Sequence, residues 1–400
     1  MKSPSVKAMA LCDSVLKLAN LSGAFCLIGM VYILEKEDLY PLYLQSTASA
    51  SILYLLILSG FGPLVSRSLS LELMARYLRR VMGAWLIVSF IMVVFFLLLN
   101  DKEYLNVYLI FSSVLLSSAL SVPWALHILP SSSILIVAVR IVFWLGLFLS
   151  FFKSNFWILY VSVTLSCALQ AKIMWGDCGR LGQRNVYTNP EKLDVSNLYS
   201  FRVKEIGARL NENLCNYLAA FILPGASLML FHAVMKSCSI GASFLYIPVR
   251  ANLRGGDELD YLSKYAIKYA LPSFSAVLGG WFVFTIIADP IITSLSKKFV
   301  FMELDKMLSF AHFFSQPVLL VVLASVFVHV YMKAKKDIFA WPLVFMRIEI
   351  TGIIMSVFYG CFIWAYQDLL SVLTMILSHF VFSASRDYIV YFGYKKFKSP

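Results

Sequence analysis

Long runs of apolar residues, separated by short polar breaks, extend along most of the 400-residue chain. A helix needs about 20 apolar residues to cross the hydrocarbon core of a bilayer. With that length, the chain divides into spans near 12–34, 42–66, 81–99, 104–126, 131–152 and 155–174, and then near 207–224, 226–249, 268–288, 309–331, 343–365 and 369–392. The runs are too long for membrane strands and do not alternate apolar with polar residues. The pattern therefore predicts about twelve transmembrane helices.

Short polar segments mark the ends of these spans. Charged residues at 35–38 and at 100–103 interrupt the apolar pattern, and each group indicates a turn between neighbouring helices. The boundary between the seventh and eighth spans stays open. It lies either at Pro224-Gly225 or nearer to Lys236-Ser237, and both choices leave two spans in that stretch.

Composition excludes a soluble protein. Hydrophobic residues make up 60% of the chain and charged residues 14%, whereas soluble domains have about 45–50% and about 25%. The net charge of +12 comes from Lys and Arg in short clusters between spans. This distribution follows the positive-inside rule and predicts that both termini are cytoplasmic. The clusters are expected to face lipid headgroups, not nucleic acid.

A polar segment at 177–204 divides the chain near its middle. Six predicted spans lie in residues 1–176 and six in 205–400. Residues 60–80 and 245–265 also share a pattern, in which Pro, Val and Arg end a span and Glu and Tyr-Leu follow. Parallel repeats with a substrate site between them are a transporter architecture. We therefore expect an all-α integral membrane protein with two six-helix bundles around a central cavity and a cytoplasmic linker between them.

The second span carries residues that point to a family. The segment 42–70, LYLQSTASASILYLLILSGFGPLVSRSLS, is rich in small residues and ends in Gly60, Gly62 and Arg67, and Lys17 and Asn20 lie in the first span. These features resemble the oligosaccharide repeat-unit flippases of bacterial O-antigen assembly. Those flippases belong to the multidrug/oligosaccharidyl-lipid/polysaccharide exporter superfamily. Ser59 stands where that pattern usually has an acidic residue.

The resemblance implies a function. The chain would translocate undecaprenyl-pyrophosphate-linked repeat units across the bacterial inner membrane by alternating access, without a cofactor. Its partners would be the lipid-linked oligosaccharide and membrane lipids, with the polysaccharide polymerase and chain-length machinery as further candidates. The chain contains no GxxxxGK[ST] motif for a nucleotide.

Polar residues inside the spans are the candidate site residues, because ionisable groups there usually face a cavity or a partner. Asp13, Lys17 and Asn20 share one helix face. They form either a self-neutralised pair near the interface or the lining of a cavity. Arg209, Glu212, Asn213 and Asn216 form a second stripe, which either makes interhelical hydrogen bonds or lines a water-filled, sugar-facing surface.

Further ionisable residues complete the set. The cavity candidates are Lys17, Arg140, Arg209, Glu212, Asn213, Asn216, Lys236 and Arg347, and Asp13 and Glu212 are candidates for ion coupling. Arg386 and Asp387 in the last span either belong to the functional residues or lie near the cytoplasmic boundary and only anchor the helix. The five histidines are scattered, so no metal site is expected.

Three alternative functions were weighed against the flippase. A membrane-embedded polymerase or ligase would need a sizeable outside domain, and the longest predicted outside loop, 289–306, is short, so we expect no enzyme. A multidrug antiporter of the same superfamily would favour an acidic cavity for cationic substrates. A transporter of another fold would share the same hydropathy.

Overall fold

The structure is a computed structural model. It describes most residues of 23–59, all of 71–127, 130–182, 195–236 and 346–398, and scattered residues between 238 and 328. The rest of the chain lies outside this description, as do some side chains within the helices, among them that of Arg347. All structural statements below concern the described residues.

The described chain is helical, and no residue in it forms a β-strand. The long helices are α2 (Leu39–Leu58), α4 (Leu71–Leu99), α5 (Lys102–His127), α6 (Pro130–Phe152), α7 (Trp157–Gly182), α8 (Val195–Ile222), α13 (Met346–Ala365) and α14 (Val372–Lys398), with a 3-10 turn η2 (Gln367–Leu369). A further helix covers 225–236. The all-α prediction is confirmed, and the number of about twelve spans stays a prediction.

The observed helix ends differ in part from those that the apolar pattern predicts. α8 ends at Ile222 and the next helix starts at 225, so the break lies at Pro224, the first of the two sites considered. α7 continues to Gly182 and α8 already begins at Val195. Both helices therefore extend into the polar segment 177–204. An amphipathic sequence can remain helical after it leaves the apolar layer, and hydropathy does not register that continuation.

Two tight turns connect neighbouring helices. Asn100, between α4 and α5, has a φ of 47°, and Ser154, between α6 and α7, has a φ of 49°. Both are left-handed conformations that few residues other than glycine adopt. The side-chain oxygen of Asp101 accepts a hydrogen bond from the backbone N–H of Glu103 at 2.9 Å, as helix-capping residues do. The turn predicted at 100–103 is confirmed.

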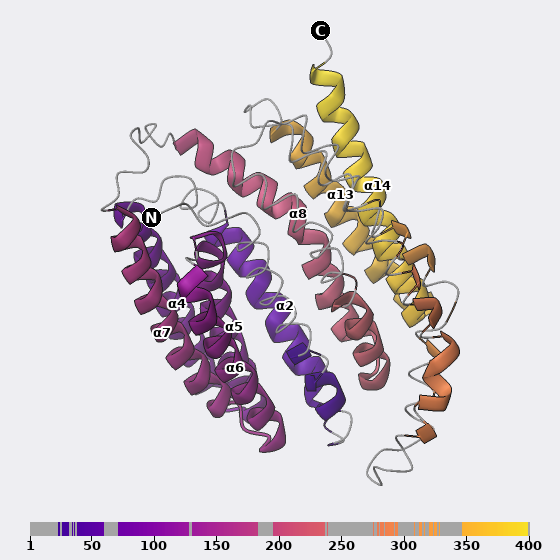
Figure 1. The fold of residues 1–400 in the computed structure, drawn as a ribbon, viewed down its shortest axis with the longest axis horizontal. Coiled ribbons are helices and arrows are strands. Elements are labelled where there is room, and N and C mark those ends of the chain that lie inside the picture. Colours follow the sequence, from indigo (N-terminus) through magenta and orange to yellow (C-terminus); the bar gives the residue numbers. More distant parts are fainter. Residues whose placement is uncertain are drawn as a thin grey trace.

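α2 lies between two groups of helices (Figure 1). Helices α4, α5, α6 and α7 gather on one side, where α5 packs on α4 and α7, and α6 on α7. On the other side α2 packs along α8, which in turn carries α13 and α14. The contact between α2 and α8 therefore joins the helices from the first half of the sequence to those from the second.

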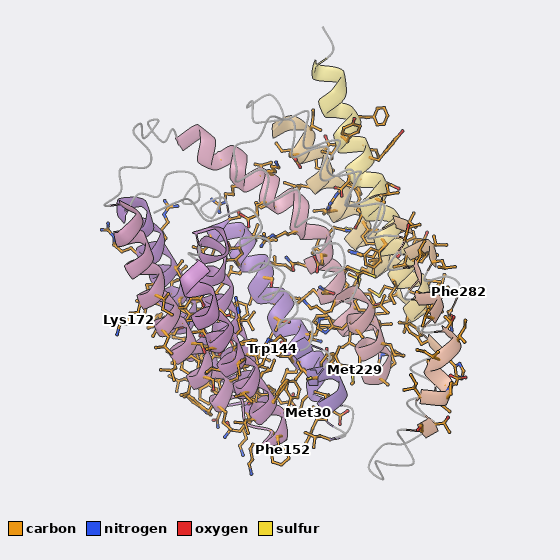
Figure 2. The ribbon with its side chains drawn as sticks, viewed as in Figure 1. Met30, Trp144, Phe152, Lys172, Met229 and Phe282 are labelled. Atoms are coloured by element: carbon orange, nitrogen blue, oxygen red, sulfur yellow. The ribbon has the colours of Figure 1, made fainter. Side chains whose placement is uncertain are left out.

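The outer surface of the molecule is apolar. Phe90 and Leu98 of α4 are 71% and 75% exposed, and such a surface would be unfavourable in water. Three of the described helices are long and apolar enough to cross a membrane, namely Leu39–Leu58, Arg79–Leu99 and Ile348–Ala365. Lys172 and Phe282 mark opposite edges of the molecule (Figure 2). The chain is built as a multi-pass membrane protein, with lipid as the solvent for these faces.

The interior is closely packed. Tyr43 of α2, Phe151 of α6 and Phe156 make successive edge-on ring contacts at 5.6 Å between centroids. A Cβ atom at Gly146 of α6 would lie 2.3 Å from the Cβ atom of Ser162 on α7. The absence of a side chain at Gly146 lets these two helices approach closely, as small residues do in membrane bundles.

Candidate functional site

A cavity of about 250 Å³ lies between the two groups of helices. It is bounded by α2, α5, α6, α8 and the helix 225–236. Its polar lining consists of Thr47, Ser51, Ser117, Arg140, Glu212, Asn213, Asn216, His232 and Lys236. Its other lining residues are Tyr43, Leu44, Ala48, Val114 and Phe143. Helices from both halves of the sequence therefore form the same cavity.

The cavity lies near the middle of three of the helices that line it. α2, α5 and α6 contribute lining residues around positions 47, 115 and 140, which are close to the centres of these helices. A helix rises 1.5 Å per residue, so the centre of a 20-residue span is about 15 Å from either end. Secondary transporters bind substrate at this depth.

The charged residues of the lining are Arg140, Lys236 and Glu212, a sum of two positive charges and one negative charge. All three are partly exposed. No ion pair or hydrogen bond joins any of them to another residue of the described chain. Ionisable groups that are neither paired nor directed at water are costly inside a membrane. Three such groups around one cavity indicate a polar, hydrated site.

Amide and hydroxyl groups add hydrogen-bonding capacity. The side-chain oxygen of Asn216 is buried and has no hydrogen-bond partner in the described chain. Thr47 and Ser51 donate their hydroxyl protons to backbone carbonyls of their own helix, those of Leu44 at 3.0 Å and Thr47 at 2.8 Å. Their oxygens therefore remain available as acceptors. A ligand with hydroxyl groups would satisfy these atoms.

Polar contacts connect the two groups of helices beside the cavity. The hydroxyl of Tyr40 on α2 shares a hydrogen bond with Nδ1 of His232 on the helix 225–236. The side-chain amide of Gln45 donates a hydrogen bond of 3.1 Å to the carbonyl oxygen of Ala220 on α8. Any separation of α2 from the second group of helices would break both contacts.

The structure brings five of the expected site residues together: Arg140, Glu212, Asn213, Asn216 and Lys236 line one cavity. Their role in binding a substrate stays a prediction. Asp13, Lys17 and the side chain of Arg347 lie outside the described part of the chain.

Arg209 does not line this cavity. Its side chain is 50% exposed and forms an ion pair of 3.5 Å with Glu205, four residues earlier on α8. The sequence spacing places Arg209 on the same face as Glu212 and Asn216, but one turn nearer the beginning of the helix. Helical periodicity defines a face and leaves the depth along it open, so a role of Arg209 in substrate binding stays a prediction.

Sequence reasoning missed several lining residues. His232, Tyr43 and Phe143 line the cavity but were not among the predicted site residues. On α2, the lining residues Leu44, Thr47, Ala48 and Ser51 follow the spacing i, i+3, i+4, i+7. This stripe of small and partly polar residues could have indicated the lining face of α2 from the sequence. His232 and Lys236 are likewise four residues apart and share a face.

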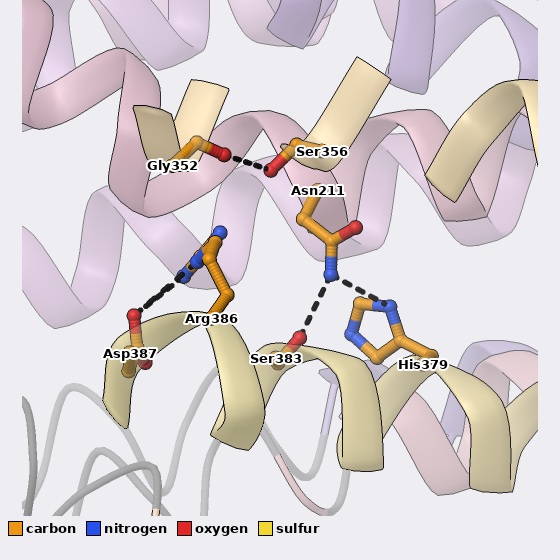
Figure 3. A network of polar contacts seen from close by, with 7 residues as sticks. All are labelled: Asn211, Gly352, Ser356, His379, Ser383, Arg386 and Asp387. Carbon is orange, nitrogen blue, oxygen red and sulfur yellow. Dashed lines mark hydrogen bonds and ion pairs between the residues drawn. The ribbon is translucent and has the colours of Figure 1, made fainter. Parts of the chain in front are cut away.

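A second polar cluster lies within the C-terminal helices, where α8 meets α14 (Figure 3). The side-chain amide of Asn211 donates a hydrogen bond of 2.8 Å to Ser383 and contacts Nδ1 of His379 at 3.4 Å, both on α14. On the same helix Arg386 donates to Asp387 at 2.9 Å. This cluster holds α14 against α8.

Arg386 and Asp387 are not boundary anchors. Their exposed fractions are 3% and 4%, whereas an anchoring side chain would reach the headgroup region. Arg386 lies in the middle of α14, which extends to Lys398, so the helix is longer than its apolar span suggested. In the described chain, no three His, Cys, Asp or Glu side chains are arranged to hold a metal ion.

Comparison with known proteins identifies the fold. No family model and no curated protein sequence matches the chain. A solved structure, described as "Crystal structure of MATE in the straight conformation", is similar with a TM-score of 0.50 at 8% sequence identity. The similarity covers 97% of this chain and 93% of that chain. The chain therefore has the fold of that MATE transporter structure.

Proposed function

We propose that this chain is a flippase for undecaprenyl-pyrophosphate-linked oligosaccharide repeat units in O-antigen or polysaccharide assembly. The observation that carries the proposal is the cavity between the two groups of helices. There Arg140 and Lys236, which form no ion pair with a described residue, lie beside the amides of Asn213 and Asn216. Guanidinium and ammonium groups bind phosphate oxygens, and amides bind sugar hydroxyl groups. The same cavity lining thus offers cations for the pyrophosphate and amides for the sugar.

The physical problem of translocation matches this lining. The substrate carries a hydrophilic sugar and an anionic pyrophosphate, which must cross about 30 Å of hydrocarbon. A cationic, hydrated cavity near the midplane replaces part of the hydration that the headgroup loses. The polyprenyl tail requires no such replacement, because lipid dissolves it.

The size of the cavity limits what it holds. Its volume of about 250 Å³ corresponds to about eight water molecules at about 30 Å³ each. This is the size of a pyrophosphate group with its first sugar and smaller than an oligosaccharide. In this conformation the cavity would hold the head of the substrate, and a longer sugar chain would extend out of it.

Alternating access would deliver the substrate to the outer face. Rocking of the two groups of helices exposes such a site to either side in turn, and here it requires breaking the Tyr40–His232 contact. An inside-negative potential favours outward movement of anions by about 2.3 kcal/mol per charge per 100 mV. The membrane potential therefore supplies a driving force without ATP.

The proposal includes location and partners. The protein would lie in the bacterial inner membrane with both termini in the cytoplasm, as the distribution of Lys and Arg predicts. Its product would be used by a polysaccharide polymerase and the chain-length machinery. Glu212 is the one carboxylate in the described lining.

Deletion of the gene tests the function. Lipid-linked repeat units should then accumulate on the cytoplasmic face of the inner membrane, where neither externally added glycosidases nor lectins reach them in intact spheroplasts. Single repeat units on the outer face would indicate a polymerase instead. An unchanged glycolipid pool would exclude both functions.

A multidrug antiporter is the second candidate, and the MATE fold is the observation that favours it. The charges of the described lining argue against it, because two cations and one carboxylate would repel a cationic drug. Susceptibility to cationic dyes separates the two. A flippase mutant should retain the dye resistance of the parent strain, whereas loss of an antiporter should lower it.

A further inference from the structure

We propose that His232 donates a hydrogen bond from Nε2 to a phosphate oxygen of the bound headgroup, in a tautomer that Tyr40 fixes from the other group of helices. This inference rests on the proposed function and deepens it, because it adds a binding residue and a positioning residue to the same cavity. It follows from the different surroundings of the two ring nitrogens of one buried imidazole.

The hydroxyl of Tyr40 is the donor in its contact with His232. Tyr40 is fully buried, and Nδ1 of His232 is the hydrogen-bond partner that its hydroxyl has among the described residues. A buried O–H group that finds no acceptor is strongly disfavoured, so the tyrosine proton points at Nδ1. Nδ1 must then carry a lone pair.

The lone pair on Nδ1 determines where the imidazole carries its proton. A neutral histidine has one N–H donor and one acceptor nitrogen, and the hydrogen bond at one nitrogen selects the tautomer. With Nδ1 as the acceptor, the proton lies on Nε2. The imidazolium form does not fit this contact, because both of its nitrogens are donors. His232 is therefore a neutral side chain with its N–H group at Nε2.

Nε2 of His232 faces the cavity. His232 is one of the lining residues, and its Nδ1 atom is turned toward α2. Within the described part of the chain, Nε2 makes no hydrogen bond and does not belong to the side-chain atoms that are both buried and without a partner. The ring of Tyr40 lies against the imidazole, with 5.8 Å between the ring centroids. The N–H group is thus directed at the space that a ligand would fill.

Lys236 indicates which atom of the ligand accepts this hydrogen bond. It lies four residues after His232 on the helix 225–236, so the two side chains share one helix face, and both line the cavity. The ammonium group of Lys236 attracts the anionic phosphates of the headgroup. A neutral N–H donor on the same face adds a hydrogen bond to phosphate without the like-charge repulsion that a second cation beside Lys236 would meet.

The contact with Tyr40 also links the conformation of the protein to its affinity for the headgroup. Alternating access separates α2 from the helix 225–236, and the Tyr40 hydroxyl then leaves Nδ1. Without this partner the imidazole of His232 can carry its proton on either nitrogen, so the ligand loses an oriented donor. Ligand binding and closure of the contact therefore favour each other, as linkage requires. The headgroup is held more tightly while the contact is closed and is released more readily after it opens.

Nitrogen NMR tests the tautomer directly. The full-length protein, containing isotope-labelled histidine, is measured in lipid nanodiscs, and the signals of His232 are identified by their absence from His232→Gln. We expect a directly bonded proton on Nε2 and none on Nδ1. In Tyr40→Phe the tautomer with its proton on Nδ1 should become populated. A proton on Nδ1 of His232 in the wild-type protein would overturn the proposal, even if a variant proves unstable.

Affinity for the headgroup tests the role in binding. One probe is a synthetic ten-carbon prenyl pyrophosphate joined to one N-acetylglucosamine, and a second probe lacks the sugar. His232→Asn keeps a side-chain oxygen that can accept the Tyr40 proton and removes the donor at the position of Nε2. We expect its Kd to rise at least about tenfold for both probes. His232→Gln, whose amide nitrogen reaches the position of Nε2, should retain more affinity, and Tyr40→Phe should weaken binding less than His232→Asn does.

His312→Asn is the matched control, because His312 is exposed and does not line the cavity. It should bind both probes as the wild-type protein does, and thermal unfolding checks that each variant is folded. Wild-type affinity of a folded His232→Asn variant would overturn the proposal while leaving the flippase function intact. A loss of affinity confined to the probe with the sugar would overturn the assignment to a phosphate oxygen. Absence of binding of either probe to the wild-type protein would overturn the proposed function and this inference with it.

Discussion

The hydroxyl of Tyr40 and Nδ1 of His232 share a hydrogen bond that links residues 192 positions apart in the sequence. Both side chains are buried, and His232 also lines the cavity. The contact therefore connects the boundary between the two groups of helices with the wall of the candidate binding site. In an alternating-access cycle this bond would have to open and re-form.

Replacing Tyr40 by Phe should destabilise the protein. The substitution keeps the ring but leaves Nδ1 of His232 buried without a partner, at a cost of about 1–3 kcal/mol. Thermal unfolding in detergent, followed by tryptophan fluorescence, measures the effect. Tyr160→Phe is the matched control, because the Tyr160 hydroxyl in α7 makes no hydrogen bond to a described residue. Equal stability of the two variants would argue against the contact.

Gly146 should be intolerant of any side chain. An added Cβ would lie 2.3 Å from Ser162, so Gly146→Ala must push α6 and α7 apart, at a cost of about 1–3 kcal/mol. At Gly83 of α4 nothing lies within 4 Å of an added Cβ. Gly83→Ala should therefore raise helix stability by about 0.5–1 kcal/mol. A comparison of the two unfolding temperatures tests the close approach, and a stable Gly146→Ala variant would contradict it.

The buried pair Arg386–Asp387 should show strong coupling. Arg386→Leu removes the guanidinium that pairs with the buried Asp387 carboxylate and should cost about 3–5 kcal/mol. The double variant Arg386→Leu with Asp387→Leu removes both charges and should recover much of that loss. A double-mutant cycle on thermal stability measures the coupling. Additive effects of the two substitutions would show that the pair makes no significant interaction.

The helices were predictable from the sequence, and their ends only in part. Apolar runs gave α5, α6 and α13 to within a few residues, because lipid-facing and core-facing positions are both apolar in a membrane. The span predicted at 42–66 continues past Leu58, where α2 ends. α4, α7 and α8 extend beyond their spans through amphipathic stretches that hydropathy assigns to loops. The turn at Asn100 was found because its charged residues interrupt the pattern.

The cavity was predictable as a set of polar positions but not as a shape. Arg140, Glu212 and Lys236 were identified because ionisable residues within apolar runs are rare. That they surround one space depends on the packing of α2 against α8, which no local pattern contains. The same reason explains why the partner of Tyr40 could not be foreseen, since a long-range contact leaves no periodic signal in one sequence.

Arg209 gives a prediction that differs from the sequence-based expectation. The side chain is half-exposed and its pair with Glu205 joins adjacent turns of one helix. Such pairs contribute about 0.3–0.5 kcal/mol. Arg209→Ala should therefore leave both stability and export nearly unchanged. Complementation of the gene deletion measures export. A loss of export as large as that of a Lys236 variant would show that Arg209 takes part in substrate binding.

The central claim is that the cations of the cavity bind the anionic headgroup. The most direct measurement is translocation of a fluorescent pyrophosphate-linked prenyl sugar by the reconstituted protein in liposomes. Arg140→Gln and Lys236→Gln should each lower the rate at least about tenfold, since a charge-assisted hydrogen bond contributes about 1.5–3 kcal/mol. Lys172→Gln, at an exposed position of α7, should translocate at the wild-type rate. Wild-type rates for both cavity variants, in correctly folded protein, would contradict the account.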